Sequence, residues 1–181
     1  DPLFMSFTQH PLFRHICEVV YGKGVDISIF RAMFMNKPAH KGTMLPWHQD
    51  RWSNLDKDPL VTIWTALDSA TIENGCVQII PKTHHALLNP DHASGFLTDD
   101  MARDFCGEED RVFVELAAGE SILLHNWLLH SSDVNRSSQP RRAFSASYMR
   151  SDTLQDGQPI PYPVVFGAGA LTASDIPAGR R

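Results

Sequence analysis

Short stretches of alternating or β-branched residues, each ended by a turn signal, recur along most of this 181-residue chain. Residues 26–36 alternate over much of their length, and residues 60–67 combine β-branched with aromatic side chains. Both patterns are typical of strands. Further strands are predicted at residues 76–80, 111–116, 121–127, 128–132 and 143–149. A helix is predicted at residues 8–20, where apolar side chains recur at helical spacing.

This order of elements predicts an all-β core with one flanking helix. A double-stranded β-helix, the jelly roll of cupin-like proteins, is favoured because it brings an early and a late strand to one mouth. The sequence has no internal repeat, so residues 1–181 are expected to form a single domain. Residues 84–110 are predicted to form a long loop with a short helix near residues 100–104.

Two other segments are predicted to lack regular structure. Residues 38–46 read as a loop between two prolines, and the tail after Asp152 is rich in proline, glycine and alanine. Asn74-Gly75 is a strong turn signal between two predicted strands.

Composition and charge exclude several classes of function. The formal net charge of −5 provides no basic field for nucleic acid or an anionic membrane surface. The sequence contains no run of 18 or more apolar residues, so no membrane-spanning helix is predicted. The N-terminus lacks a signal-peptide pattern. Three widely spaced cysteines favour free thiols in the cytoplasm over a disulfide framework. The expected partner is a small molecule, and the oligomeric state stays open.

His48, Asp50 and His130 are the candidate metal ligands. Residues i and i+2 of a strand point to the same side, so His48 and Asp50 can converge, and His130 can complete the set. Two imidazoles and one carboxylate form the facial triad of non-haem Fe(II) oxygenases. Because the chain has nine histidines, spacing alone leaves a metal site and ordinary surface polarity equally supported.

Arg141 lies eleven residues after His130, at the start of the last predicted strand. A guanidinium group beside a metal ligand needs an anionic partner, and its planar fork suits a carboxylate. The alternative is that Arg141 and Arg142 are both surface charges. Neighbours on a strand face opposite sides, so the two cannot easily both point inward.

Residues 29–149 resemble the phytanoyl-CoA dioxygenase family of Fe(II)/2-oxoglutarate-dependent oxygenases. The resemblance rests on the order and spacing of several blocks: Met33 with Asn36-Lys37-Pro38, His48-Gln49-Asp50, Trp64-Thr65-Ala66, Asn74-Gly75-Cys76, Pro81-Lys82-Thr83-His84, and His130 to Arg141. It implies a jelly roll with Fe(II) held by His48, Asp50 and His130.

The resemblance also implies a site for 2-oxoglutarate. The co-substrate would chelate the metal and pair its far carboxylate with Arg141, which Ser132 would share. Trp64 and Met33 match positions that line the co-substrate, and Arg142 would be structural. His125 has a counterpart in the family without a known ligand role, and it is expected to be a satisfied core histidine.

The implied activity is that of a 2-oxoglutarate-dependent dioxygenase. Such an enzyme uses O₂ to hydroxylate an aliphatic carbon of a small organic substrate and releases succinate and CO₂. The presence of Asp50 speaks against halogenation, because related halogenases replace this carboxylate with a small residue. Arg51 and Trp52 flank the motif and are candidate substrate residues. Arg51 either meets an anionic substrate group or is a solvated charge at the rim.

Relatives usually carry a long segment before the first strand, and some co-substrate contacts come from it. Either that segment is missing here or this family member is compact, so co-substrate contacts from it are not assigned. Two other functions remain open. A cupin-like metal enzyme without 2-oxoglutarate predicts that Arg141→Ala leaves activity intact. A non-catalytic β-sandwich binding module predicts neither Fe(II) uptake nor oxygen-dependent succinate formation.

Overall fold

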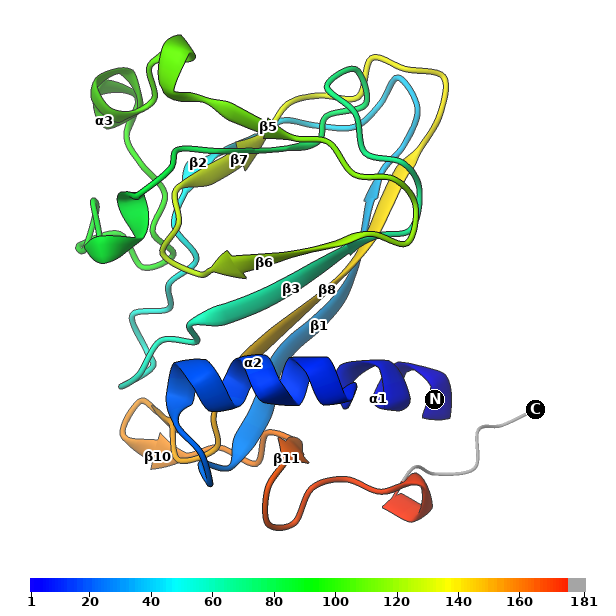
Figure 1. Ribbon diagram of the computed structural model, residues 1–181. Coiled ribbons are helices and arrows are strands. Elements are labelled where there is room, and N and C mark those ends of the chain that lie inside the picture. Colours follow the sequence, from blue (N-terminus) through cyan, green and yellow to red (C-terminus); the bar gives the residue numbers. More distant parts are fainter. Residues whose placement is uncertain (176–181) are drawn as a thin grey trace.

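The computed structural model describes residues 1–175, and its core consists of two β-sheets that face each other (Figure 1). The larger sheet has the strand order β11-β1-β8-β3-β6, and the smaller has the order β2-β7-β4-β5. All their strand pairs are antiparallel, as in a jelly roll. The strands are β1 (Ile27–Lys37), β2 (Leu45–His48), β3 (Val61–Ala66), β4 (Val77–Ile79), β5 (Val112–Val114), β6 (Ser121–His125), β7 (His130–Ser132), β8 (Arg141–Arg150) and β11 (Val164–Phe166).

Alternation along β3 and β8 divides the larger sheet into an outer and an inner face. Ile63, Phe144 and Tyr148 belong to an outer apolar cluster that the helices cover. Trp64 and Ala143 belong to a second cluster between the sheets. All six residues of β3 are buried, because both faces of this strand are covered. The β-branched and aromatic run that predicted this strand therefore reflects burial on two sides.

Two helices pack on the outer face in place of the single helix predicted (Figure 1). These are α1 (Pro2–Thr8) and α2 (Pro11–Tyr21), which buries Phe13 and Cys17. The break falls at His10, whose ψ of 136° is non-helical. Pro11 explains it, because proline disfavours the helical conformation in the residue before it.

The structure adds strands in two segments that were predicted to be irregular. Strand β2 includes Pro46, which the edge position of this strand tolerates because no partner needs its missing N–H. Strand β11 pairs with β1, and β9 (Leu154–Gln155) pairs with β10 (Gln158–Pro159). The prediction of an irregular tail was therefore wrong for these residues, and its part beyond residue 175 lies outside the described residues.

Other predictions about individual segments are confirmed. Helix α3 (Asp99–Phe105) begins at Thr98, whose side chain accepts a hydrogen bond from the N–H of Met101. Gly75 has a φ of +79° and turns the chain from the larger sheet to the smaller one. Three short 3₁₀ turns complete the described elements: η1 (Thr83–His85), η2 (Glu108–Asp110) and η3 (Ala173–Asp175). The three cysteines are free and buried. Within residues 1–175, every helix is too short or too polar to cross a membrane.

Candidate functional site

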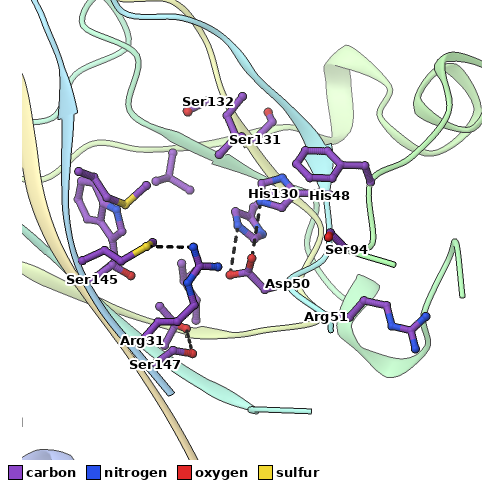
Figure 2. A pocket seen from close by; sticks show the side chains of 18 of the residues that line it. Arg31, His48, Asp50, Arg51, Ser94, His130, Ser131, Ser132, Ser145 and Ser147 are labelled. Atoms are coloured by element: carbon purple, nitrogen blue, oxygen red, sulfur yellow. Dashed lines mark hydrogen bonds and ion pairs between the residues drawn. The ribbon is translucent and has the colours of Figure 1, made fainter. Parts of the chain in front are cut away.

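A cavity of about 390 Å³ lies between the two sheets (Figure 2). Its volume is within the usual range for sites that bind small molecules. Every residue predicted for the site lines this cavity: His48, Asp50, His130, Arg141, Ser132, Trp64, Met33, Arg51 and Trp52.

His48, Asp50 and His130 come together at one wall of the cavity. His48 and His130 are direct partners across the β2–β7 ladder, and their ring centroids lie 4.2 Å apart. The Nε2 atoms of His48 and His130 lie 3.8 and 3.9 Å from the two carboxylate oxygens of Asp50. One donor atom from each residue falls within 4.8 Å of the others, a grouping that could hold one metal ion.

Backbone carbonyls select the nitrogen that each ring presents to this cluster. The Nδ1 of His48 lies 2.8 Å from the carbonyl of Pro46, and the Nδ1 of His130 lies 2.8 Å from that of Leu128. A carbonyl only accepts, so Nδ1 carries the proton in both neutral rings and Nε2 keeps its lone pair. Burial, together with the neighbouring His130 ring, lowers the pKa of His48 to about 4 and keeps it neutral.

Asp50 lies just beyond the end of β2, so strand alternation alone does not place it. Its N–H donates to the carbonyl of Asn126, at 2.7 Å. That bond fixes the carboxylate against the loop that leads to His130.

Gln49 is a positioning residue that the sequence did not reveal. Its side chain is fully buried and turned away from the cluster. The carbonyls of Thr83, Ala86 and Trp127 share the two hydrogens of its amide nitrogen, and its oxygen accepts from the N–H of Leu88. Gln49 therefore ties the segment between His48 and Asp50 to two neighbouring loops.

Residues 95–97 cover the other edge of β2. Gly95 accepts from the N–H of Gln49 at 3.1 Å, and the N–H of Leu97 donates to Trp47. Gly95 has a φ of +68°, and an added Cβ would lie 2.1 Å from the carbonyl oxygen of Gln49. This close approach lets Phe96 stack on His48, with centroids 4.7 Å apart. A larger residue at position 95 has no room.

The opposite end of the cavity carries the buried guanidinium of Arg141. Only 1% of the residue is exposed, and its Nη2 donates to the carbonyl of Gly75 at 2.8 Å. Its Cζ lies 5.3 Å from the centroid of the Trp64 ring. The Nε of Arg141 and the indole N–H of Trp64 are buried without a hydrogen-bond partner in the described part of the chain. Burial lowers the pKa of Arg141 to about 10, so the group remains charged at neutral pH.

A second cation, the ammonium of Lys37, lies near Arg141, and the nearby carboxylate is paired elsewhere. Lys37 pairs with Arg141 across β1 and β8, and its ammonium donates to the carbonyls of Thr43 and Asp133. Burial and the charge of Arg141 lower the pKa of Lys37 to about 8. The nearby carboxylate of Asp133 is already paired with Arg136. The electrostatics of this end therefore favour binding of an anion.

Arg142 faces the other way, as neighbours on a strand must. Its guanidinium pairs with Asp68 on the surface, with Nη2 and Oδ1 2.7 Å apart.

Two arginines line the cavity at its other end, and their guanidinium groups point in different directions. Figure 2 shows the guanidinium of Arg31 directed toward Asp50, whereas that of Arg51 points away. Arg51 donates to the carbonyl of Pro90. The predicted substrate role of Arg51 stays a prediction. Arg31 was missed, although its alternation with Met33 and Met35 on β1 was a signal that it shares their face.

Three further histidines form a separate cluster outside the cavity. The ring centroids of His84 and His125 lie 5.3 Å apart, and those of His84 and His85 lie 4.1 Å apart. The Nδ1 of His125 accepts from the N–H of Trp127. Burial lowers the pKa of His125.

The chain is similar in sequence and in structure to several known proteins. A phytanoyl-CoA dioxygenase of Arabidopsis thaliana is 30% identical over 156 residues, which cover 84% of this chain and 54% of that protein. The chain spans about half the length of the first relatives it matches.

Two solved structures have the same jelly-roll fold. The non-heme monooxygenase ThoJ in its apo form superposes with a TM-score of 0.72 and 22% identity, covering 91% of this chain and 62% of that one. The epimerase SnoN, in complex with Fe³⁺, α-ketoglutarate and nogalamycin RO, gives a TM-score of 0.69 and 22% identity, covering 86% and 61%.

The family model for phytanoyl-CoA dioxygenase (PhyH) matches residues 3–143, a span that holds both predicted histidine ligands, Asp50 and Arg141. The chain belongs to the phytanoyl-CoA dioxygenase family.

Proposed function

We propose that residues 1–181 form an Fe(II)- and 2-oxoglutarate-dependent dioxygenase domain that hydroxylates a carbon of a small organic substrate. The observation that carries this proposal is one cavity with two complementary ends. One end gathers two imidazoles and a carboxylate, and the other holds a buried guanidinium that has no carboxylate partner among residues 1–175.

The donor set fits Fe(II). His48 and His130 each present an Nε2 lone pair, because their Nδ1 protons are held by backbone carbonyls. Asp50 adds one negative charge. Two nitrogens and one oxygen on a single face leave other metal positions open for further ligands. A bound iron supplies the oxidation chemistry, in which O₂ is consumed and 2-oxoglutarate is converted to succinate and CO₂.

The residues at the other end fit the far carboxylate of 2-oxoglutarate. Arg141 is buried, and its Nε has no partner among the described residues, so a bidentate carboxylate would satisfy it. Ser132 lines the cavity beside it and can donate its hydroxyl to the same carboxylate. Trp64 holds the guanidinium on its ring face, and Met33 forms part of the apolar wall. These contacts orient the diacid and exclude water from it.

Whether the substrate is hydroxylated or oxidised in another way depends on how it is held beside the His48–Asp50–His130 cluster. Solved neighbours with this fold include a monooxygenase and an epimerase, so the fold alone does not choose between hydroxylation and other oxidations. We propose hydroxylation for this chain, and the carboxylate of Asp50 supports it against halogenation, because it occupies the place that a halide would need.

The decisive experiment is anaerobic addition of Fe(II) and then 2-oxoglutarate to the purified chain. A weak visible charge-transfer band is expected, together with saturable binding of 2-oxoglutarate. His48→Ala should lose both iron and band. Arg141→Met should keep the iron and bind 2-oxoglutarate about tenfold or more weakly, since a charge-assisted pair is lost.

Arg142→Met is the matched control, because its guanidinium lies on the opposite face of the same strand. Equal loss in both arginine variants would contradict the assigned co-substrate site. Iron uptake without 2-oxoglutarate binding would favour a cupin-like metal enzyme, and absence of both would favour a binding module. Succinate formation in air, screened over a substrate library, would then identify what is oxidised.

A further inference from the structure

We propose that Arg31 binds the anionic head of the substrate, and that the substrate is a small organic acid with an apolar body. This inference rests on the proposed function, which gives the Arg141 end of the cavity to 2-oxoglutarate.

The register of β1 and β8 separates the two cationic positions. Lys37 pairs with Arg141, whereas Arg31 pairs with Ser147, six residues further along each strand. At the usual rise per residue, this separation is about 20 Å along the ladder. A five-carbon diacid anchored at Arg141 is much shorter than that. Arg31 therefore belongs to a different part of the cavity, with the His48–Asp50–His130 cluster facing the space between them.

The surroundings of Arg31 leave its charge available. Within residues 1–175, no carboxylate oxygen lies within 4.0 Å of its guanidinium. Its contacts are the Sδ atom of Met33, 3.0 Å from Nη2, and the ring of Trp52, whose centroid lies 5.6 Å from Cζ. A thioether is a weak acceptor, and an aromatic face attracts a cation without neutralising it.

A ligand that fills this end would displace the water around Arg31. A guanidinium that loses its water needs an anionic or strongly accepting partner in return. An oxyanion on the ligand supplies that partner, whereas a neutral ligand of the same shape would leave the charge unpaired.

Two hydroxyls and one amide at this end are already hydrogen-bonded to one another. Thr62 donates to Asn126 or shares its hydroxyl with Ser147, and Asn126 also donates to Ser147. Trp52 and Phe96 supply aromatic walls. A guanidinium without a carboxylate partner in residues 1–175, beside hydrogen-bonded hydroxyls and aromatic walls, favours a ligand with an anionic head.

The direction of Arg31 also limits where oxidation occurs. Its guanidinium points toward Asp50 (Figure 2), so a head group held there keeps the adjacent carbons near the cluster. We therefore expect oxidation close to the oxyanion and not at the far end of a long chain.

The test measures binding, without turnover, by anaerobic calorimetry on the chain loaded with Fe(II) and 2-oxoglutarate. The probes are hexanoate, benzoate and cyclohexanecarboxylate, each beside its own amide, with hexylphosphonate to distinguish a carboxylate from a phosphonate head. At least one acid is expected to bind about tenfold or more tightly than its amide. Arg31→Met should abolish that preference, and Arg31→Lys should retain part of it.

Arg142→Met is the matched control and should keep the preference, because that guanidinium pairs with Asp68 on the surface. Circular dichroism confirms that each variant is folded. Four results would overturn the proposal: amides that bind as tightly as acids, no binding of any probe, an unchanged preference in Arg31→Met, or an equal loss of preference in Arg142→Met.

The same variants separate this inference from the proposed function. Arg31→Met should bind 2-oxoglutarate as the wild type does, and a weakened co-substrate would reassign Arg31 and overturn the proposal. If the wild type binds neither iron nor 2-oxoglutarate, the proposed function fails. The acid and amide titrations on the metal-free chain then still decide whether Arg31 selects an anion.

Discussion

The two histidine clusters of this molecule lie on either side of Gln49, and they differ in the nitrogen that each ring makes available. In His48 and His130, Nδ1 donates to a backbone carbonyl, so Nε2 keeps a lone pair. In His125, Nδ1 accepts from a backbone N–H, so the proton of the neutral ring lies on Nε2. Nearness of imidazole rings therefore does not by itself make a metal site.

The second difference is the carboxylate. Asp50 contacts both rings of the first cluster, whereas His84, His85 and His125 belong to no group of three potential ligands within the described residues. A cluster of neutral rings with one anion suits a divalent cation, and a cluster of rings alone does not hold it as strongly.

The largest effect is expected from removing that anion. Asp50→Asn keeps the shape of the side chain but removes its charge. We expect Fe(II) affinity to fall by about a thousandfold, which corresponds to about 4 kcal/mol. Anaerobic calorimetry measures it. Retention of wild-type affinity would break the comparison, because the carboxylate would then not distinguish the clusters.

Gln49 connects the two clusters, and its loss should affect stability. Gln49→Ala leaves three carbonyls and one N–H without partners in a buried site, so we expect unfolding to become easier by about 3 kcal/mol. Urea denaturation measures the change. Gln139→Ala, at an exposed position, is the control and should leave stability unchanged. Similar curves for both variants would mean that the amide network contributes nothing.

Acid should destabilise the metal-free protein through His48. Burial first, and the His130 ring second, lower the pKa of His48 from 6.5 to about 4. Between these values the unfolded chain binds the proton more readily, so stability is complete above about 6.5 and falls as the pH drops. The expected loss is about 1 to 3 kcal/mol. Urea midpoints across this range measure it, and His48→Gln should flatten the curve more than His125→Gln.

The smallest effect is expected from the second cluster. His125→Ala removes a half-buried ring that lines no part of the cavity, so Fe(II) and 2-oxoglutarate affinities should stay within about twofold of wild type. The calorimetric titrations used for Asp50→Asn measure both. A loss of iron comparable to that of Asp50→Asn would show that the second cluster takes part in metal binding.

The residues of the site were more predictable from the sequence than several of the strands and side chains that hold them in place. His48, Asp50, His130 and Arg141 were recognised because their residue types carry chemistry and their spacing fits a jelly roll. Strands β3 and β8 were recognised because burial demands β-branched and aromatic residues. The short β2 was missed, since four residues with a proline give almost no periodic signal.

What the sequence could not reveal depends on pairing between distant segments. Strand β11 exists because β1 offers it an edge, which the composition of the tail does not indicate. Gln49 looks like any polar residue until its four backbone partners are known. Arg31 resembles a surface charge until the β1–β8 register turns it into the cavity.

The stacking of Phe96 on His48 bears on how ligands enter and leave. A polar segment as long as residues 84–110 is often a hinged flap. Residues 95–97 of this segment, however, are hydrogen-bonded to β2, the strand that carries His48. Moving the segment outward would break those hydrogen bonds and remove the Phe96 ring that stacks on the His48 imidazole. Ligands are therefore expected to enter and leave on the side of the exposed Arg31, and opening of residues 95–97 is expected only when the metal is released.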